Sequence, residues 1–168
     1  MERIVPLALS VLFLMSSSAC KPEPSPLQDG VDAGVPKDPP SVSDVRDKLK
    51  EEGYEVFDYV EEKSGDTILM QQYFIAFLKS GPNRSQSKEE ADSLQRLHMA
   101  HLSRMYEEGH ADISGPFGDD GAIRGITIYN TPTLRIADSL ANLDPMVRAG
   151  RLVVEIHPWW AAKGYPLR

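Results

Sequence analysis

Two histidines close together in the sequence, His98 and His101, are the first candidates for chemistry. They lie three residues apart, so in a helix they share one face. The other positions of that face, at steps of three and four, are apolar: Leu94, Leu97, Leu102 and Met105. An apolar helix face packs against a sheet, and an imidazole held between the two could transfer protons near neutral pH. We therefore expect a functional site in the stretch 98–116.

Two other roles are open to this histidine pair. His98 and His101 could bind a metal ion together with His157 or Asp144. The sequence has no His-Glu-x-x-His motif and no cysteine pair, so we predict no metal site. The histidines could also be core side chains that bond to backbone carbonyls, which is the more frequent fate of a lone histidine on an apolar helix face.

The composition limits the function. The chain has 168 residues, of which 18 are basic and 25 acidic, and its net charge is −7. Sequence-independent nucleic-acid binding needs a basic surface, so we expect no nucleic-acid partner. The one cysteine excludes an intrachain disulfide framework and any multi-cysteine zinc site. The sequence contains no cofactor motif, and we expect no cofactor.

Residues 1–19 have the pattern of a signal peptide. Arg3 precedes a mostly apolar run over 4–15, which is too short to span a bilayer. The following Ser-Ser-Ala-Cys resembles a bacterial lipoprotein cleavage site, although Ser17 stands where leucine is usual. We predict a lipid anchor on Cys20. The alternative is an ordinary signal peptide cut nearby, which would give a secreted protein.

Residues 20–42 are predicted to be a disordered spacer. Six prolines occur between residues 21 and 40, and such a segment cannot bury enough apolar area to offset its ordering entropy. The spacer would hold a globular domain on the periplasmic side of a bacterial cell envelope. Lys21 is not the aspartate of inner-membrane retention signals, which favours the outer membrane.

Residues 43–66 are predicted to form an N-terminal extension. Ser43 can cap a short helix that Gly53 ends. Residues 54–78 then form a hairpin, with its turn at 63–66.

Residues 67–168 are predicted to form the main domain. Ser87 and Glu90 make a capping box at the start of a helix over 88–108. The other expected elements are strands over 67–78, 110–115, 122–129 and 151–157, a helix over 134–142, and a one-turn helix from Asp144-Pro145 to Gly150. This order predicts an α+β, ferredoxin-like βαββαβ fold with both helices on one face of an antiparallel sheet.

The other face of that sheet would be open in a monomer. The strand around Tyr73, Ile75 and Phe77 is apolar on both faces. We therefore expect a homodimer that forms through these three residues or through the opposite set. Trp159 and Trp160 favour the same kind of interface.

Over about residues 72–164 the sequence resembles the YCII-related family of small α+β proteins. The resemblance rests on the order and spacing of several pieces: His98, Glu107-Glu108-Gly109, Gly115-Pro116-Phe117, Asp119-Asp120-Gly121, Arg124-Gly125-Ile126, residues 144–155 and His157-Pro158-Trp159. It implies a ferredoxin-like fold, a dimeric α+β barrel, and a His–Asp pair proposed as the active site. By spacing, the family histidine corresponds to His98 and the family aspartate to Asp144.

In such a pair the carboxylate fixes the tautomer of the imidazole and leaves its other nitrogen for a substrate. The structural alternative for Asp144 is a helix N-cap with proline at the next position. We predict that His101, Gly115, Pro116 and Arg124 bind the substrate. Gly115-Pro116 could equally be a plain turn. Arg124 could meet an anionic substrate or could be a solvated strand residue.

The resemblance also bears on the reaction. One member of the family is a dechlorinating lyase of aromatic degradation, and related barrel folds include isomerases and monooxygenases. The resulting hypothesis is a small, anchored, cofactor-free acid–base enzyme of lyase or isomerase type that acts on a small organic molecule. The alternative is a non-catalytic dimeric module that binds a ligand or a partner, with His98 and Asp144 in structural roles.

Overall fold

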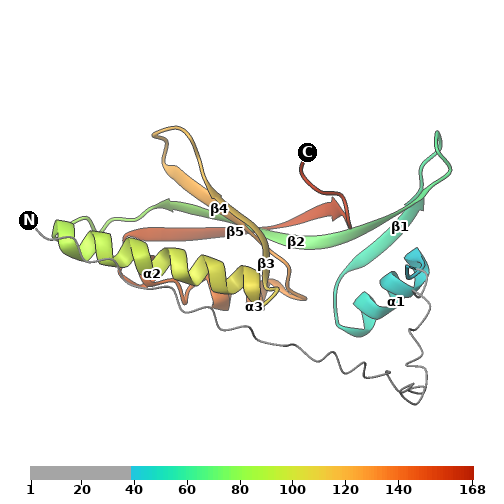
Figure 1. The fold of residues 1–168 in the computed structure, drawn as a ribbon, viewed down its shortest axis with the longest axis horizontal. Coiled ribbons are helices and arrows are strands. Elements are labelled where there is room, and N and C mark those ends of the chain that lie inside the picture. The colour runs from blue at the N-terminus through green and yellow to red at the C-terminus, as the bar shows by residue number, and fades with distance from the viewer. Residues whose placement is uncertain (1–38) are drawn as a thin grey trace, which may run out of the picture. The chain divides into compact units, whose positions relative to one another are not determined.

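The computed structural model describes residues 39–168. The predictions for the signal peptide, for Cys20 and for most of the spacer lie outside these described residues. The elements are α1 (Val42–Glu51), β1 (Val56–Val60), β2 (Thr67–Ser80), α2 (Lys88–Glu107), β3 (Ala111–Pro116), β4 (Ile123–Tyr129), α3 (Leu134–Ala141), α4 (Pro145–Arg148) and β5 (Leu152–Ala162) (Figure 1). No helix in this part of the chain combines the length and apolarity needed to cross a membrane.

The strand β2 is the centre of an antiparallel sheet. It pairs with β4 along one edge and with β5 along the other, and β3 lies outside β4. The strand order is therefore β3-β4-β2-β5, with α2 connecting β2 to β3 and α3 connecting β4 to β5. This is the βαββαβ arrangement, and the prediction of an α+β, ferredoxin-like fold is confirmed.

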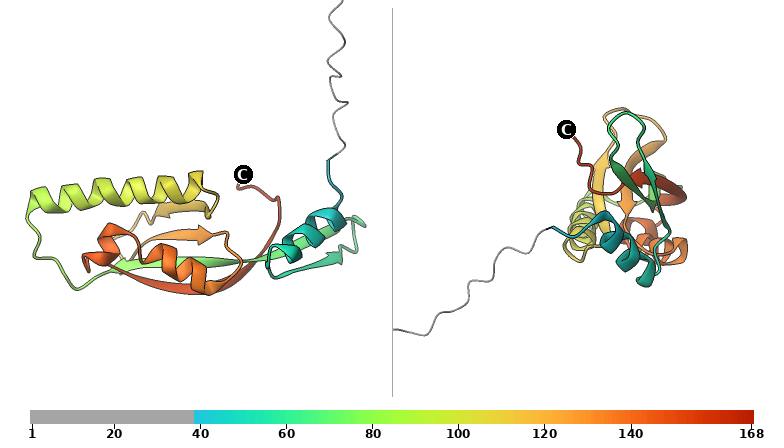
Figure 2. Two further views of the ribbon diagram at one scale, coloured as in Figure 1. Left: turned by 90° about the horizontal axis from the view of Figure 1, so that it is seen from below. Right: turned by 90° about the vertical axis from the view of Figure 1, so that its right-hand side faces the viewer.

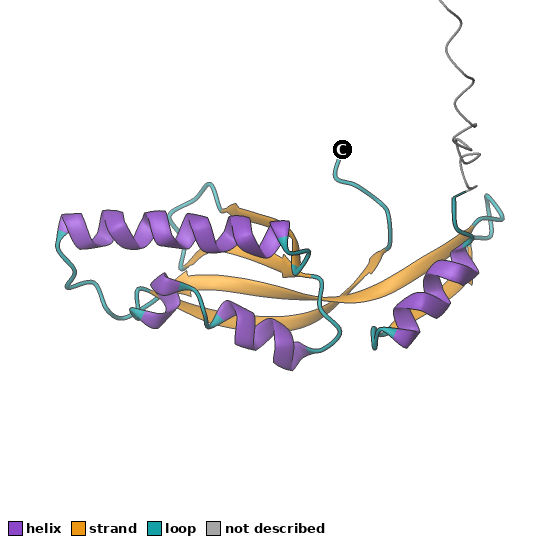
Figure 3. Cartoon of the chain, turned by 60° about the horizontal axis from the view of Figure 1, so that its bottom comes forward, coloured by secondary structure: helices purple, strands orange, loops and turns teal. Residues whose placement is uncertain are grey.

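One face of the sheet is covered by helices. Phe74 and Ala76 of β2 point to this face and are buried together with residues of α2, α3 and the neighbouring strands: Met105, Ala111, Tyr129, Ala137 and Ala141. In Figure 3 both α2 and α3 lie in front of the strands. Because both helices cover the same face, side chains from α2 and from the segment after α3 can meet there.

The helix α2 begins as predicted. Ser87 accepts a hydrogen bond from the backbone N–H of Glu90, and the Glu90 carboxylate accepts one from the backbone N–H of Ser87. The buried side of the helix differs in one respect from the prediction, because Leu97 is 51% exposed. Leu97 lies on the flank of the helix that turns away from the sheet.

The N-terminal extension continues the central strand. The first half of β2 pairs with β1, from Val56 opposite Gln71 to Val60 opposite Thr67. The helix α1 lies alongside β1 at this end of the sheet (Figure 2). The prediction that Ser43 caps this helix is wrong, because Ser41 caps α1 and forms a capping box with Asp44. The reciprocal bonds need an acidic residue three positions after the cap, and Ser43 has none there.

Asn130 is the centre of a group of hydrogen bonds beside the extension. Gln71 is fully buried, and its Nε2 donates to Oδ1 of Asn130 at 2.6 Å. Asn130 Nδ2 donates in turn to Asp112 Oδ1 at 3.1 Å. The hydroxyl of Tyr54 donates to the carbonyl oxygen of Asn130. The bond from Tyr54 therefore joins the extension to the main domain, and the other two lie within the main domain.

The last strand is longer than the sequence predicts. It was expected to end at residue 157, but β5 continues to Ala162 and pairs with β2 from Leu152 opposite Ser80 to Ala162 opposite Met70. Pro158 lies inside this strand. A proline is tolerated there because β5 is at the edge of the sheet and has a free side.

The second face of the sheet carries no helix over its central part. Tyr73, Ile75 and Phe77 lie on this face opposite Trp159, His157 and Glu155 of β5. The rings of Tyr73 and Trp159 are 6.3 Å apart, and burial raises the pKa of Tyr73 to about 12. We call this the helix-free face.

Candidate active site

The structure brings His98 and Asp144 together. His98 lies in the middle of α2, and Asp144 is the N-cap of α4. Nδ1 of His98 is 2.6 Å from Oδ2 of Asp144. Both residues are buried, with exposed fractions of 8% and 2%. A carboxylate can only accept hydrogen bonds, so Nδ1 carries the hydrogen and Nε2 of the neutral ring keeps its lone pair.

Asp144 uses its two oxygens for different purposes. Oδ2 accepts the hydrogen bond of His98, while Oδ1 accepts one from the backbone N–H of Met146 at 2.8 Å. Pro145 occupies the first position of α4. Asp144 is therefore a helix cap and a histidine partner at once, and the two interpretations of its sequence context are both correct in geometry. The capping bond also holds the carboxylate in one orientation.

His98 lies at the edge of a pocket of about 860 Å³. The pocket is between α2 on one side and the strands β3 and β4 on the other. Its floor is apolar and consists of Leu78, Met146 and Leu152, which pack against one another. Within residues 39–168, Nε2 of His98 makes no hydrogen bond. The dyad therefore offers an unpaired ring nitrogen beside a space large enough for a small organic molecule.

Three of the residues predicted to bind substrate line this pocket. Gly115 and Pro116 form its rim at the end of β3, and Arg124 lies at the start of β4. Gly125 pairs with Leu78 whereas Ile123 pairs with Lys79, so Arg124 is the extra residue of a β-bulge. A bulge changes the direction of a side chain relative to the regular strand.

His101 does not line the pocket. It is buried at 4% exposure on the other side of His98, and Arg104 donates a hydrogen bond to its Nδ1 at 3.1 Å. Its Nε2 is buried without a partner. Burial lowers the pKa of His101, and the nearby Arg104 lowers it further, although Asp144 acts in the opposite direction. His101 is therefore a neutral core histidine next to the dyad.

Two arginines that line the pocket, Arg84 and Arg151, were not among the predicted site residues. Arg84 precedes α2, and Arg151 precedes β5. Arg151 lies in the family segment 144–155, whereas Arg84 lies in none of the family segments, and each reaches the pocket because the loop over 81–87 folds against the start of β5. Sequence spacing alone contained no signal for this convergence.

The histidines and carboxylates do not gather into a metal site in this part of the chain. No group of three or more histidine, cysteine, aspartate or glutamate side chains among residues 39–168 has a suitable arrangement. His157, which was considered as a third ligand, lies on the helix-free face, where its Nε2 is 2.8 Å from Oε1 of Glu155.

Comparisons with known proteins match the chain to several solved structures and to one family. No curated protein matches the chain. One of these structures is the 5-chloro-2-hydroxyhydroquinone dehydrochlorinase from Burkholderia phenoliruptrix AC1100 in complex with 2,5-dihydroxybenzoquinone. It is 18% identical, has a TM-score of 0.41, and matches over 52% of this chain and 92% of that chain. The family model of the YCII-related domain matches residues 73–160, which is more than half of the chain. The protein therefore belongs to the YCII-related family.

Proposed function

We propose that this protein is an acid–base enzyme of lyase or isomerase type that acts on a small organic molecule without a cofactor. The observation that carries the proposal is the buried hydrogen bond from His98 Nδ1 to Asp144 Oδ2, which leaves Nε2 unpaired at the edge of a pocket. Membership of the YCII-related family agrees with a site of this kind.

In the proposed reaction His98 is the general base and Asp144 its positioning residue. Nε2 takes a proton from carbon or oxygen of the substrate, and the electron pair of the broken bond forms a new double bond. In an isomerisation the imidazolium returns the proton at another atom. In an elimination a leaving group departs with its bonding electrons. Asp144 stabilises the imidazolium through Oδ2, and the apolar floor of the pocket holds the body of the substrate.

Deuterium exchange tests this role without knowledge of the product. In D₂O a general base that removes a carbon-bound proton exchanges it for deuterium, which proton NMR detects. The probes are small lactones, cyclic enones and phenols. We expect the protein to catalyse exchange in at least one probe and His98→Asn to abolish it, with a melting temperature within a few degrees of the wild type.

The same experiment separates the alternative function. In a non-catalytic binding module, a probe would bind, as seen by chemical-shift changes in the protein, but neither protein would catalyse exchange. A large loss of stability in His98→Asn with unchanged probe binding would assign His98 to the core.

We also propose that the domain is attached to the bacterial cell envelope through a lipid on Cys20. The support is the apolar run over 4–15 followed by Ser-Ser-Ala-Cys. The expected result is that the full chain fractionates with membranes and that Cys20→Ser fractionates with soluble proteins. A Cys20→Ser protein that stays with membranes would contradict the anchor.

The third part of the proposal is a homodimer formed through the helix-free face. Tyr73, Ile75 and Phe77 lie there, together with Val153 and Trp159, which are 45% and 41% exposed. These apolar side chains share the face with Lys79, Glu155 and His157, and a sheet face that no helix covers is a candidate partner surface.

A further inference from the structure

Three arginines from distant parts of the sequence line the same end of the pocket. They are Arg84, from the loop before α2, Arg124, from the start of β4, and Arg151, from the residue before β5. We call this part of the pocket the basic end. The protein as a whole carries a net charge of −7, so a local group of three positive side chains needs an explanation of its own.

Backbone contacts fix the basic end. The N–H of Ser80 donates to the carbonyl of Ala122, and the N–H of Gly81 donates to the carbonyl of Arg151, both at 2.9 Å. A Cβ atom at Gly81 would lie 2.2 Å from the carbonyl oxygen of Gly150, so only glycine allows this close approach. The loop after β2 and the starts of β4 and β5 are thereby held at one end of the sheet.

The charges at the basic end are not neutralised by the protein. Among residues 39–168, none of the three arginines lies within 4.0 Å of a carboxylate. Arg124 Nη1 donates to the carbonyl oxygen of Gly121 at 3.2 Å, and Arg151 Nη1 donates to Oε1 of Gln86 at 3.1 Å. Nε of Arg151 is buried and has no partner. A buried guanidinium N–H without an acceptor is costly, and the other N–H groups of the three arginines are the donors that an anion in the pocket can use.

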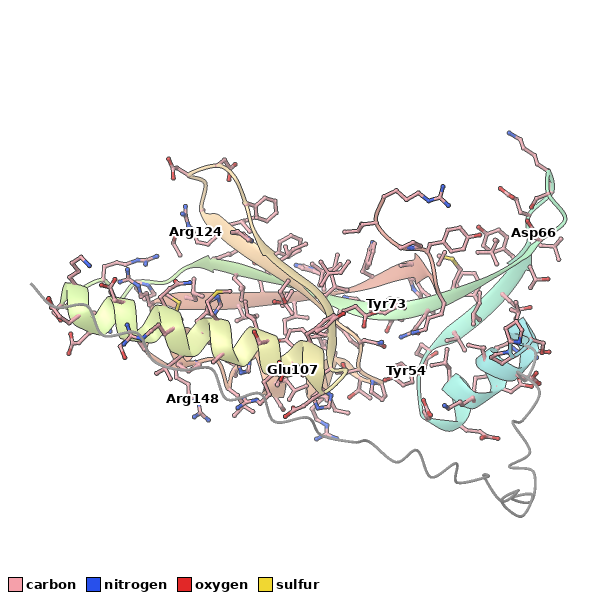
Figure 4. The ribbon with its side chains drawn as sticks, in the orientation of Figure 1. Tyr54, Asp66, Tyr73, Glu107, Arg124 and Arg148 are labelled. Carbon is pink, nitrogen blue, oxygen red and sulfur yellow. The ribbon has the colours of Figure 1, made fainter. Side chains whose placement is uncertain are left out.

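The pocket is also polarised along its length. Its carboxylates, Glu107 and Asp112, lie on either side of the turn from α2 to β3, at the opposite end from Arg124. Figure 4 shows Glu107 near the end of α2 and Arg124 at the start of β4. His98 lies between the two ends. The short helix α4 connects Asp144 to the segment of Arg151, and its four residues span about 6 Å at 1.5 Å per residue.

We propose that the basic end binds the anionic group, a carboxylate or a phosphate, of the small molecule that occupies the pocket. The planar guanidinium presents paired N–H groups that match both anions. The apolar floor takes the carbon skeleton, and the skeleton extends from the basic end toward Nε2 of His98. The orientation toward His98 rests on the proposed function, whereas the anion site itself does not.

Binding of three aromatic probes tests the site. Benzoate carries a carboxylate, phenyl phosphate carries a phosphate, and benzamide is a neutral analogue of benzoate. Dissociation constants are measured by NMR titration of the folded domain, residues 39–168 with their natural sequence, and of the full chain. We expect at least one of the anions to bind about tenfold or more tightly than benzamide and its affinity to fall with rising salt concentration.

Arg151→Gln and Arg124→Gln should each weaken binding of that anion by about tenfold, because each removes a charged donor. The matched control is Arg148→Gln, which makes the same change in net charge. Arg148 is exposed in the last turn of α4, does not line the pocket, and lies on the opposite side of α2 from Arg124 in Figure 4. Its variant should bind within about twofold of the wild type.

Two results would overturn the proposal. One is that neither anion binds better than benzamide. The other is that Arg148→Gln weakens anion binding as much as the variants at the basic end, which would show a general charge effect. Arg124 is exposed, so its variant keeps the test valid if Arg151→Gln unfolds. His98→Asn should still bind the anion, so a failure of the catalytic proposal and a failure of the anion site give different results.

Discussion

At the scale of single residues, Asp144 shows why a sequence can support two interpretations that are both right. An aspartate before a proline at a helix start predicts an N-cap, and the family pattern predicts a histidine partner. The structure satisfies both because a carboxylate has two oxygens, and each takes one donor. The convergence with His98 could be anticipated because both helices of a ferredoxin-like unit cover the same face of the sheet.

Substitutions at Asp144 should separate the cap from the dyad. Asparagine caps a helix as well as aspartate does, and its oxygen must face the N–H of Met146. Its amide N–H₂ then faces Nδ1 of His98 and donates to it, so the hydrogen of the ring moves to Nε2. Asp144→Asn should keep near wild-type stability but change the tautomer of His98, which ¹⁵N chemical shifts report, and should abolish deuterium exchange.

Asp144→Ala is the comparison. It removes the cap, at about 1 kcal/mol, and leaves a buried N–H of His98 unpaired, at about 1–3 kcal/mol. Urea unfolding measures the difference. If both variants keep the wild-type tautomer of His98, the hydrogen bond to Asp144 does not control it.

His101 should make stability depend on pH. Burial lowers its pKa in the folded protein, whereas in the unfolded chain it titrates near its ordinary value of about 6.5. Below that pH the unfolded chain takes up a proton that the folded protein resists. The free energy of unfolding should therefore fall as the pH drops from 7 to 5, by at most about 1.4 kcal/mol per pH unit from this group.

In His101→Leu this part of the pH dependence should disappear, so its unfolding free energy should change less between pH 7 and 5. Met105→Leu changes a buried residue of the same helix without removing a titratable group, and it should keep the wild-type slope. Equal slopes in His101→Leu and the wild type would show that His101 is not the group responsible.

At the scale of elements, the rotation of α2 decides which histidine reaches the pocket. Successive residues turn by about 100° around a helix axis, so His101 lies about 60° from His98 on the side away from the pocket. Met99 and Leu102 lie on the pocket side. His98 is at the border between the pocket and the core, where Asp144 meets it. The sequence could place both histidines on one helix face. Which of them borders the pocket depends on the rotation of α2 about its axis against the sheet.

The ends of strands were harder to predict than the helices. The capping box of α2 follows from local chemistry and was predicted correctly. The extra residues of β5 and the bulge at Arg124 follow from pairing with β2, which is distant in sequence. The roles of Arg84 and Arg151 depend on the same long-range register. This is why the dyad and a substrate contact of Arg124 could be proposed from the sequence, whereas the convergence of Arg84 and Arg151 with Arg124 could not.

The contact between β3 and β4 predicts the effect of one glycine substitution. A Cβ atom at Gly125 would lie 2.6 Å from the carbonyl oxygen of Gly115, which is backbone and cannot move aside easily. Gly125→Ala should lower the free energy of unfolding by about 1–3 kcal/mol, measured by urea denaturation. Gly115→Ala is the control, since nothing lies within 4 Å of its Cβ position. Equal tolerance of both substitutions would mean that the two strands can separate at this point without cost.

At the scale of the whole molecule, the two faces of the sheet are covered differently. One face is filled by helices and holds the dyad. The helix-free face carries exposed Val153 and Trp159 next to the charged cluster of Lys79, Glu155 and His157. The sequence predicted this asymmetry from the order of elements, because both helices of a βαββαβ unit fall on one side.

The proposed dimer should be sensitive to charge on the helix-free face. A stable pair buries about 1,200–2,000 Å² in total, and an aspartate at its centre would be desolvated without a partner. Ile75→Asp and Val153→Asp should sediment as monomers at micromolar concentration, where the wild type sediments as a dimer. Leu97→Asp is the control, because Leu97 is exposed on α2 away from this face. A monomeric wild type would contradict the dimer for this chain.

The length of β2 has a consequence for what counts as a unit in this protein. The family match begins at Tyr73, but β2 begins at Thr67, so the family boundary falls inside the central strand. The residues of β2 before Tyr73 pair with a strand on each side. Gln71, for example, pairs with Val56 of β1 and with Ala161 of β5. A fragment cut at the boundary would leave the end of β5 without a partner and Asn130 without Gln71. The family match is therefore shorter than the central strand, and the extension pairs along β2 itself rather than forming a separate sheet.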